Sequence, residues 1–194
     1  MNQATTTLTR ADADWQQVEW AALAAARTVL CSHSEVQRVL EQAGIKVDCI
    51  PWSLPASSKR HSRNSGQAPT IVFPASALPR KGAIEVLEVA RRLAVRVLIL
   101  GTPPSDVEAW AGVNWSAVGY SSDWLSETDA VVLPAYIEHQ PRAALKAIAA
   151  GIPVVASPAC GLTRVHGVQE VEAGDVDAIE RALTRALSAV RAEA

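Results

Sequence analysis

Arg80, Lys81 and Gly82 bring two cations and a glycine together in one loop of the chain. The loop follows an apolar run at residues 70–73 and precedes a helical pattern at residues 82–93, so it would join a strand end to a helix start. Backbone N–H groups at a helix start attract anions, and Arg or Lys side chains add formal charge. The spacing therefore predicts a phosphate site. A solvated turn remains the alternative, because neither a Walker nor a dinucleotide-binding glycine pattern is present.

A second loop gathers an acid, an imidazole and an amide at Glu138, His139 and Gln140. Glu138 could accept hydrogen bonds from hydroxyl groups, and His139 could donate to an anion or act as an acid or base. Pro141 suits the first position of a helix that would begin there. The alternative is a polar loop in which Glu138 only favours the positive end of that helix.

Metal and thiol chemistry is not expected from this sequence. Its three cysteines, Cys31, Cys49 and Cys160, are far apart and form no Cys-x-x-Cys pair. We therefore expect neither a disulfide framework nor a structural zinc site, and a reducing cytosol is the expected environment. Cys160 has no local base, so we expect a small packed side chain and not a nucleophile.

Short β-branched runs alternate with helical patterns along the chain. Apolar strands joined by helices are typical of a parallel sheet that is buried on both faces. The sequence predicts an α/β fold with a doubly wound, Rossmann-like parallel sheet, in which ligands bind beyond the carboxyl ends of the strands. The expected strands cover residues 28–31, 45–50, 70–73, 95–100, 117–119, 130–133, 153–156 and 168–171, and the expected helices 14–27, 34–42, 82–93, 142–150 and 177–190.

Composition excludes several classes of protein. The 194 residues are 49% hydrophobic and 20% charged with a net charge of −2, which fits a globular chain and argues against binding nucleic acid through bulk charge. No apolar run is long enough for a transmembrane segment, and the polar N-terminus lacks the apolar core of a signal peptide. Residues 53–69 are small, polar and turn-rich, which predicts a linker.

In chain order, the loops resemble the nucleotide-sugar-binding half of the retaining GT-B glycosyltransferases over residues 23–187. The strongest likeness lies in the strand at 129–134, the acid Glu138 and the segment 147–157, which contains the sequence Ala-Ala-Gly-Ile-Pro-Val-Val. Arg80-Lys81-Gly82 resembles the Lys-Gly phosphate loop of that family, and Gly174-Asp175 resembles the Gly-Asp pair before its last helix.

The resemblance implies a division of the chain into three parts. Residues 1–52 would be the tail of an N-terminal acceptor domain, 53–69 the linker, and 70–194 the C-terminal donor-binding domain. Because about 50 residues cannot build an acceptor domain, the resemblance also implies a missing N-terminal domain or a partner chain. A cytoplasmic location is expected, with peripheral association with the inner membrane face as an open alternative.

The chemistry implied is transfer of a sugar from a nucleoside-diphosphate sugar to a hydroxyl of an acceptor glycan or lipid-linked sugar, with retention and without a metal or resident cofactor. Lys81, Arg80 and Gly82 would bind the diphosphate. Glu138 would be the catalytic residue and would hold hydroxyls of the donor sugar. The neighbouring His139, Gln140, Arg142 and Lys146 would complete the substrate site.

Two motifs depart from the family pattern. A second glutamate usually follows the first after seven residues and holds the ribose, but Lys146 stands there and cannot accept those hydrogen bonds. Ala75 and Ser76 replace the Gly-Arg pair of the phosphate loop. These departures keep two alternatives open. One is a non-catalytic GT-B-like scaffold or regulatory subunit, and the other is an unrelated α/β nucleotide-binding or receiver-like domain.

Overall fold

The computed structural model describes residues 10–55, 68–120, 123–163 and 165–192. Most of the expected linker, residues 56–67, lies outside the described residues. The chain divides into two compact units, each described by itself below. Unit 1 comprises Met1–Ser32 and Val36–Pro51, and unit 2 comprises His33–Glu35 and Trp52–Ala194.

Unit 1 contains a two-stranded parallel sheet, β1 (Val29–Cys31) and β2 (Val47–Cys49), in which Val29 pairs with Val47. The helix α1 (Arg10–Ala25) precedes the sheet, and α2 (Ser34–Gln42) connects its strands. Helix α2 has the bounds that its sequence predicts. It is followed by Gly44 at φ +76°, a left-handed conformation that glycine adopts without a steric penalty.

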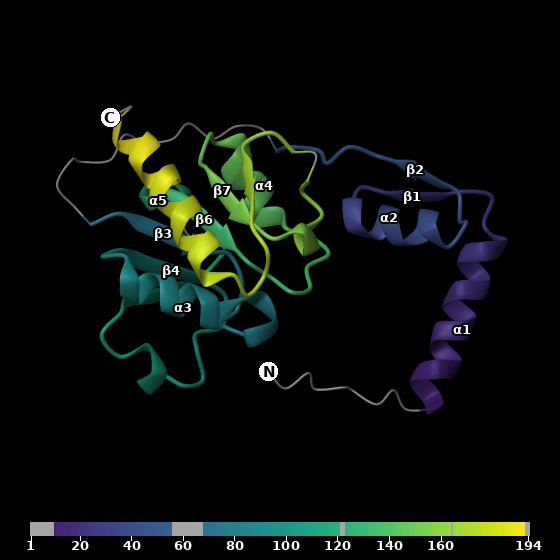
Figure 1. Ribbon diagram of the computed structural model, residues 1–194, viewed down its shortest axis with the longest axis horizontal. Coiled ribbons are helices and arrows are strands. Elements are labelled where there is room, and N and C mark those ends of the chain that lie inside the picture. The colour runs from purple at the N-terminus through teal and green to yellow at the C-terminus, as the bar shows by residue number, and fades with distance from the viewer. Residues whose placement is uncertain (1–9, 56–67, 121–122, 164, 193–194) are drawn as a thin grey trace. The chain divides into compact units, whose positions relative to one another are not determined.

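Unit 2 is built on a six-stranded parallel sheet with the order β5-β4-β3-β6-β7-β8 (Figure 1). The chain moves outward in one direction from β3 and then in the other direction from β6, so the order reverses between these two adjacent strands. This is the doubly wound arrangement that the sequence predicts, and it opens the loops after β3 and β6 toward the same edge. The strands are β3 (Thr70–Phe73), β4 (Arg96–Leu100), β5 (Asn114–Val118), β6 (Ala130–Leu133), β7 (Val154–Ala156) and β8 (Val168–Glu170).

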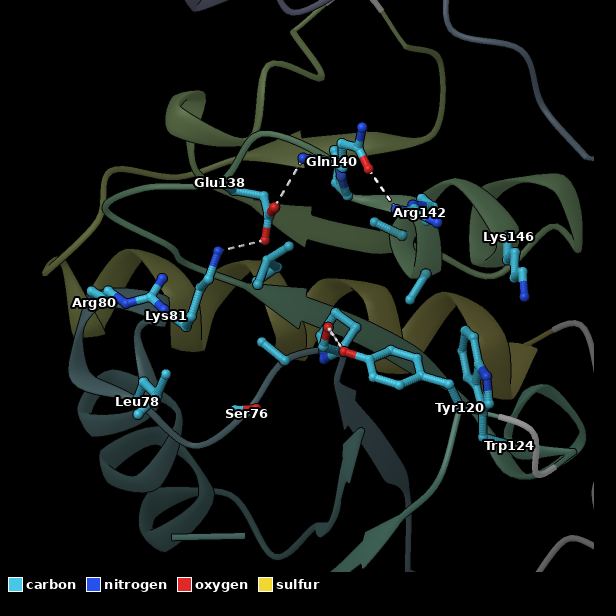
Figure 2. A pocket seen from close by; sticks show the side chains of 16 residues that line it. Ser76, Leu78, Arg80, Lys81, Tyr120, Trp124, Glu138, Gln140, Arg142 and Lys146 are labelled. Carbon is cyan, nitrogen blue, oxygen red and sulfur yellow. Dashed lines mark hydrogen bonds and ion pairs between the residues drawn. The ribbon is translucent and has the colours of Figure 1, made fainter. Parts of the chain in front are cut away.

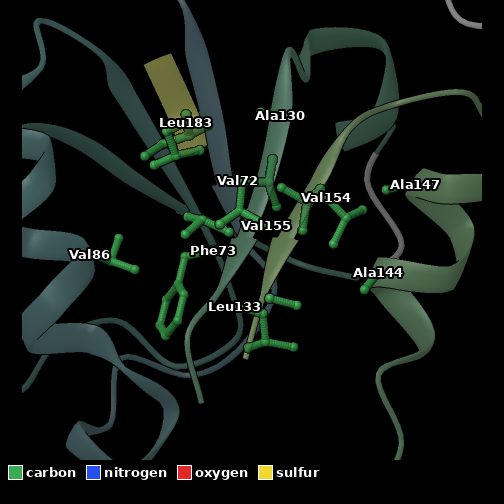
Figure 3. Packing of buried hydrophobic residues seen from close by; sticks show 14 of the residues in the cluster. Val72, Phe73, Val86, Ala130, Leu133, Ala144, Ala147, Val154, Val155 and Leu183 are labelled. Carbon is green, nitrogen blue, oxygen red and sulfur yellow. The ribbon is translucent and has the colours of Figure 1, made fainter. Parts of the chain in front are cut away.

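Helices cover both faces of this sheet. Figure 3 shows Val86 of α3 on one side of the strands and Ala144 and Ala147 of α4 on the other. Helix α5 packs beside α3, and Arg92 of α3 forms an ion pair with Glu180 of α5 at 3.1 Å. The helices are α3 (Ala83–Arg92), α4 (Arg142–Ala149) and α5 (Val176–Ala192), and short 3₁₀ turns occupy Pro79–Lys81, Glu108–Trp110, Trp124–Glu127 and Pro158–Cys160.

The core of unit 2 explains why these elements form. All four residues of β3 and all four of β6 are buried, as expected for strands covered on both faces. Helix α4 presents Ala144 and Ala147, both fully buried, to the sheet (Figure 3). Such small side chains let the helix approach the strands closely.

Two local expectations need correction. The strand expected at residues 117–119 is longer and begins earlier, as β5 at Asn114–Val118. Pro141 was expected as the first residue of a helix, but it is the cap that precedes Arg142, with ψ +52°. Among the described residues, no helix is long and apolar enough to cross a membrane.

Candidate functional site

A pocket of about 510 Å³ opens where the carboxyl ends of β3 and β6 meet (Figure 2). The loop after β3 and the 3₁₀ turn that follows supply Arg80 and Lys81, and the loop after β6 supplies Glu138. The first two turns of α4 supply Arg142 and Lys146. The site is therefore assembled from segments far apart in sequence at the edge where doubly wound sheets bind ligands. Its lining residues include four cations and one carboxylate.

Most of the residues singled out from the sequence meet in this pocket, but two do not line it. Gly82 is buried with φ +85°, and a Cβ there would lie 2.5 Å from the carbonyl oxygen of Pro134. A glycine is needed at this position so that the loops after β3 and β6 can pack closely. His139 contributes its backbone N–H to Glu138, and its side chain is not part of the pocket wall. The others, Arg80, Lys81, Glu138, Gln140, Arg142 and Lys146, line the pocket.

Lys81 and Glu138 form an ion pair inside the pocket (Figure 2), with Lys81 Nζ 2.9 Å from Glu138 Oε2. Each side chain is only 13% exposed. Lys81 Nζ also donates to the carbonyl oxygen of Ile137 at 2.8 Å. The ammonium group is thus held against two consecutive residues of the loop after β6.

The other carboxylate oxygen of Glu138 is satisfied by the backbone. Glu138 Oε1 accepts N–H bonds from His139 at 2.9 Å and from Gln140 at 3.0 Å. Partial burial alone would raise the pKa of Glu138. The hydrogen bonds from Lys81, Gln140 and His139, with the charge of Lys81, outweigh burial and hold this pKa below its ordinary value. Glu138 is therefore an ionised acceptor at neutral pH.

Arg142 and Lys146 bring positive charge to the pocket from α4. Arg142 donates to Gln140 Oε1 at 2.6 Å, a contact with a neutral amide. Among the described residues, neither cation forms an ion pair with a carboxylate. The wall at this part of the pocket is aromatic, formed by Tyr120 and Trp124.

Sequence reasoning missed Tyr120, which follows β5 and enters the same pocket. Its hydroxyl donates to the carbonyl oxygen of Pro74 at 3.3 Å, and burial together with the charge of Glu138 raises its pKa. No motif marks this residue. The available signal was topological, because the end of β5 lies at the same edge of the sheet as the ends of β3 and β6.

His33 is a second residue that the sequence did not single out. Its Nε2 lies 2.8 Å from the carbonyl oxygen of Glu138 and 3.2 Å from that of Ala159. Because carbonyl oxygens only accept, Nε2 carries the proton and donates. A Cβ on Gly161, at φ +65°, would lie 2.4 Å from the His33 ring, so the ring packs directly on this glycine. His33 thus supports the backbone of the loop that carries Glu138.

A buried acid anchors the same loop from another side. Tyr136 donates its hydroxyl to Glu85 Oε1 of α3 at 2.5 Å, while the buried Glu85 Oε2 has no hydrogen-bond partner within the described part of the chain. Cys160 lies outside the pocket wall and is fully buried. Burial raises its pKa to about 11, which keeps the thiol protonated. Among the described residues, no group of three or more His, Cys, Asp or Glu side chains could hold a metal ion.

A doubly wound sheet with a cationic pocket at its switch point defines a Rossmann-like α/β domain. The profile of the family "Glycosyl transferases group 1" matches residues 68–189, and the chain belongs to this family. This confirms the resemblance found in the motifs. A search of curated protein sequences finds no match.

Solved structures share the fold. Sucrose-phosphate synthase from Thermosynechococcus elongatus matches with a TM-score of 0.75 and 18% identity, over 98% of this chain and 56% of that one. WaaG, a glycosyltransferase involved in lipopolysaccharide biosynthesis, matches with a TM-score of 0.69 and 18% identity, over 94% of this chain and 60% of that one. The C-terminal domain of the group 1 protein LpcC from Francisella tularensis matches with a TM-score of 0.55 and 18% identity, over 68% of this chain and 87% of that one. The chain thus spans at most 60% of the first two structures.

Proposed function

We propose that this chain binds a nucleoside-diphosphate sugar and supplies the donor site for transfer of that sugar to an acceptor hydroxyl, with retention of anomeric configuration. The observation that carries the proposal is the meeting of Lys81 and Glu138 at 2.9 Å in one pocket at the carboxyl edge of β3 and β6. A cation and an acceptor side by side suit a ligand in which a phosphate adjoins a hydroxylated ring.

Each side chain has a separate part in the proposed reaction. Lys81 and Arg80 stabilise the negative charge that develops on the diphosphate as the bond to the anomeric carbon breaks. The diphosphate oxygen takes the electron pair of that bond, the acceptor oxygen bonds to the anomeric carbon, and the acceptor proton passes to the departing diphosphate directly or through water. Glu138 accepts hydrogen bonds from sugar hydroxyls. No metal or cofactor takes part.

The acceptor belongs to the proposal as well. We expect a glycan or lipid-linked sugar, presented by an N-terminal domain or partner chain that completes the cleft, on the cytoplasmic side. The chain spans only about half to three fifths of the two longer relatives, which supports the need for such a second half.

Isothermal titration with UDP, GDP and ADP tests the donor site. We expect binding at millimolar concentration or tighter for one of the three, and a folded protein that binds none contradicts the proposal. Glu138→Gln should reduce sugar transfer, measured with an acceptor and the completing half, more than it reduces binding of the bare nucleotide. Equal losses would place Glu138 at the nucleotide and not at the sugar.

One observation favours a second candidate, a non-catalytic relative that serves as a scaffold or regulatory subunit. Both oxygens of Glu138 are already engaged by Lys81 and by the N–H groups of His139 and Gln140. Lys146 also stands where the family has an acid. Unchanged transfer by a complex that contains Glu138→Ala, together with a partner recovered by pull-down, would favour this candidate.

A further inference from the structure

Helix α4 carries two cations that the described part of the protein does not neutralise. Arg142 is the first residue of the helix and Lys146 lies four positions later, so both project from one face. Both line the pocket, and Lys146 is exposed to solvent. The contact of Arg142 with Gln140 leaves its charge uncompensated, because an amide is neutral.

This placement is unfavourable for the helix itself. Like charges four residues apart repel each other, and a cation in the first turn faces the positive end of the helix dipole. Packing does not account for either residue, because both side chains belong to the pocket wall and not to the core. An anion between the two side chains would remove both penalties.

Arg142 and Lys146 lie apart from Lys81, the pocket cation that is already paired with Glu138. Figure 2 shows Lys81 and Glu138 together at one end of the pocket and Lys146 above Trp124 at the other, with Tyr120 between the two ends. The charge of Glu138 compensates Lys81 at 2.9 Å. The four cations that line the pocket outnumber its one carboxylate and the two charged phosphate groups of a nucleotide sugar taken together, so at least one positive charge on α4 remains uncompensated.

We propose that Arg142 and Lys146 form a second anion subsite, which takes a phosphate or carboxylate group that the donor carries in addition to its diphosphate. The inference rests on the proposed function. An ammonium and a guanidinium are donors only, so they suit an anionic oxygen and cannot accept from a ribose hydroxyl. The buried Trp124 side chain reduces the solvent around that group and strengthens the attraction. Two donor types have this chemistry, one with a carboxylate on the sugar and one with a phosphate on the ribose.

The test compares matched ligands at constant ionic strength, with the full chain and the nucleobase that binds best in the titrations above. One pair is the nucleotide hexose and the corresponding nucleotide hexuronate, and the other is the nucleoside diphosphate with and without a 2′-phosphate. We expect that, in one pair, the member with the additional carboxylate or phosphate binds about tenfold tighter, which is the effect of one additional charge-assisted contact. The ligand pair that shows this difference identifies whether the additional group lies on the sugar or on the ribose.

Charge removal then assigns the effect to α4. Lys146→Gln should abolish the preference for the member that carries the additional anionic group. Arg181→Gln is the matched control, because it makes the same charge change at an exposed position of α5 outside the pocket and should alter no affinity. Circular dichroism verifies that both variants are folded.

Three results would overturn the inference. If the nucleotides without the additional group bind and neither member that carries it binds tighter, the subsite is absent while the proposed function stands. If Lys146→Gln weakens both members of a pair equally, the subsite holds the diphosphate itself. If no nucleoside diphosphate binds at all, the proposed function and this inference fail together.

Discussion

At the residue scale, the ammonium group of Lys81 is already occupied by Glu138 at 2.9 Å and by the Ile137 carbonyl at 2.8 Å. A diphosphate must share or replace these contacts. We expect Lys81→Ala to weaken binding of a nucleoside diphosphate by about 1–3 kcal/mol, toward the lower value because the wild type must loosen its own ion pair. Titration calorimetry measures the change. Lys46→Ala, the same change at an exposed lysine outside the pocket, should have no effect, and unchanged affinity in Lys81→Ala would remove Lys81 from the site.

The carboxylate of Glu138 also makes stability depend on pH. Its pKa is lowered in the folded protein, where hydrogen bonds from Lys81 and the loop N–H groups outweigh the effect of burial. Such a group stabilises the fold above its unfolded pKa, and this contribution is lost as the pH falls through the folded pKa. We expect Glu138→Gln to be less stable than the wild type by about 1 kcal/mol at neutral pH, and this difference to be smaller at about pH 3. Urea unfolding at both pH values measures it, and an equal difference at both would show that the charge of Glu138 is not the cause.

The local sequence predicted that some of these residues belong to the site and gave no indication for others. Lys81 and Glu138 stand in loops where charged residues follow an apolar strand, so their types and positions predicted a shared site. Tyr120 and His33 reach the same loops from segments without a motif, and only the folded topology brings them there. Lys146 was predicted at the site from the family resemblance, and the structure places it in the pocket wall without a carboxylate partner among the described residues.

At the element scale, the junction before α3 depends on the absence of a side chain at Gly82. Its φ is +85°, and an added Cβ would lie 2.5 Å from the Pro134 carbonyl oxygen, so the loops after β3 and β6 would have to separate. We expect Gly82→Ala to lower the free energy of unfolding by at least about 2 kcal/mol, from backbone strain and the clash together. Gly151→Ala is the matched control, with φ +72° and open space around the added Cβ. Urea unfolding compares the variants, and equal losses would mean that the clash is relieved without cost.

Elements with a continuous apolar pattern were predicted with nearly correct bounds, and β3, β6 and α2 match their expected ranges. The strand β5 was misplaced because Asn114–Val118 is only partly buried and mixes polar and apolar residues. The 3₁₀ turn at Pro79–Lys81 was missed because three residues are too few to show a helical period. Because that turn contains Lys81, the sequence did not predict how this pocket residue is oriented.

At the scale of the whole molecule, alternation of strands and helices was enough to predict the doubly wound parallel sheet. Parallel crossovers are right-handed, and this rule leaves few arrangements for such a chain. The position of the reversal between β3 and β6 was not evident from any one segment, because it depends on which strands pair. The pocket lies at that reversal, so its walls could be predicted only in part.

The buried apolar cluster extends from Ile71 to Leu187, wholly within the longer segment of unit 2. We therefore expect a fragment of residues 52–194 to fold cooperatively. The fragment lacks His33, which donates to the Glu138 carbonyl at 2.8 Å and packs on Gly161. Its sheet should consequently be less stable than the same sheet in the full chain by about 1–3 kcal/mol, the cost of leaving a buried acceptor unpaired.

Hydrogen exchange of the β6 amides reports the stability of that sheet in both chains, and His33→Ala in the full chain should reproduce the loss. A fragment without protected β6 amides would show that the core needs residues before Trp52. A fragment as stable as the full chain would show that His33 adds nothing to the loop that it contacts. Since this loop carries Glu138, the first residues of unit 2 would then have no part in holding the donor site.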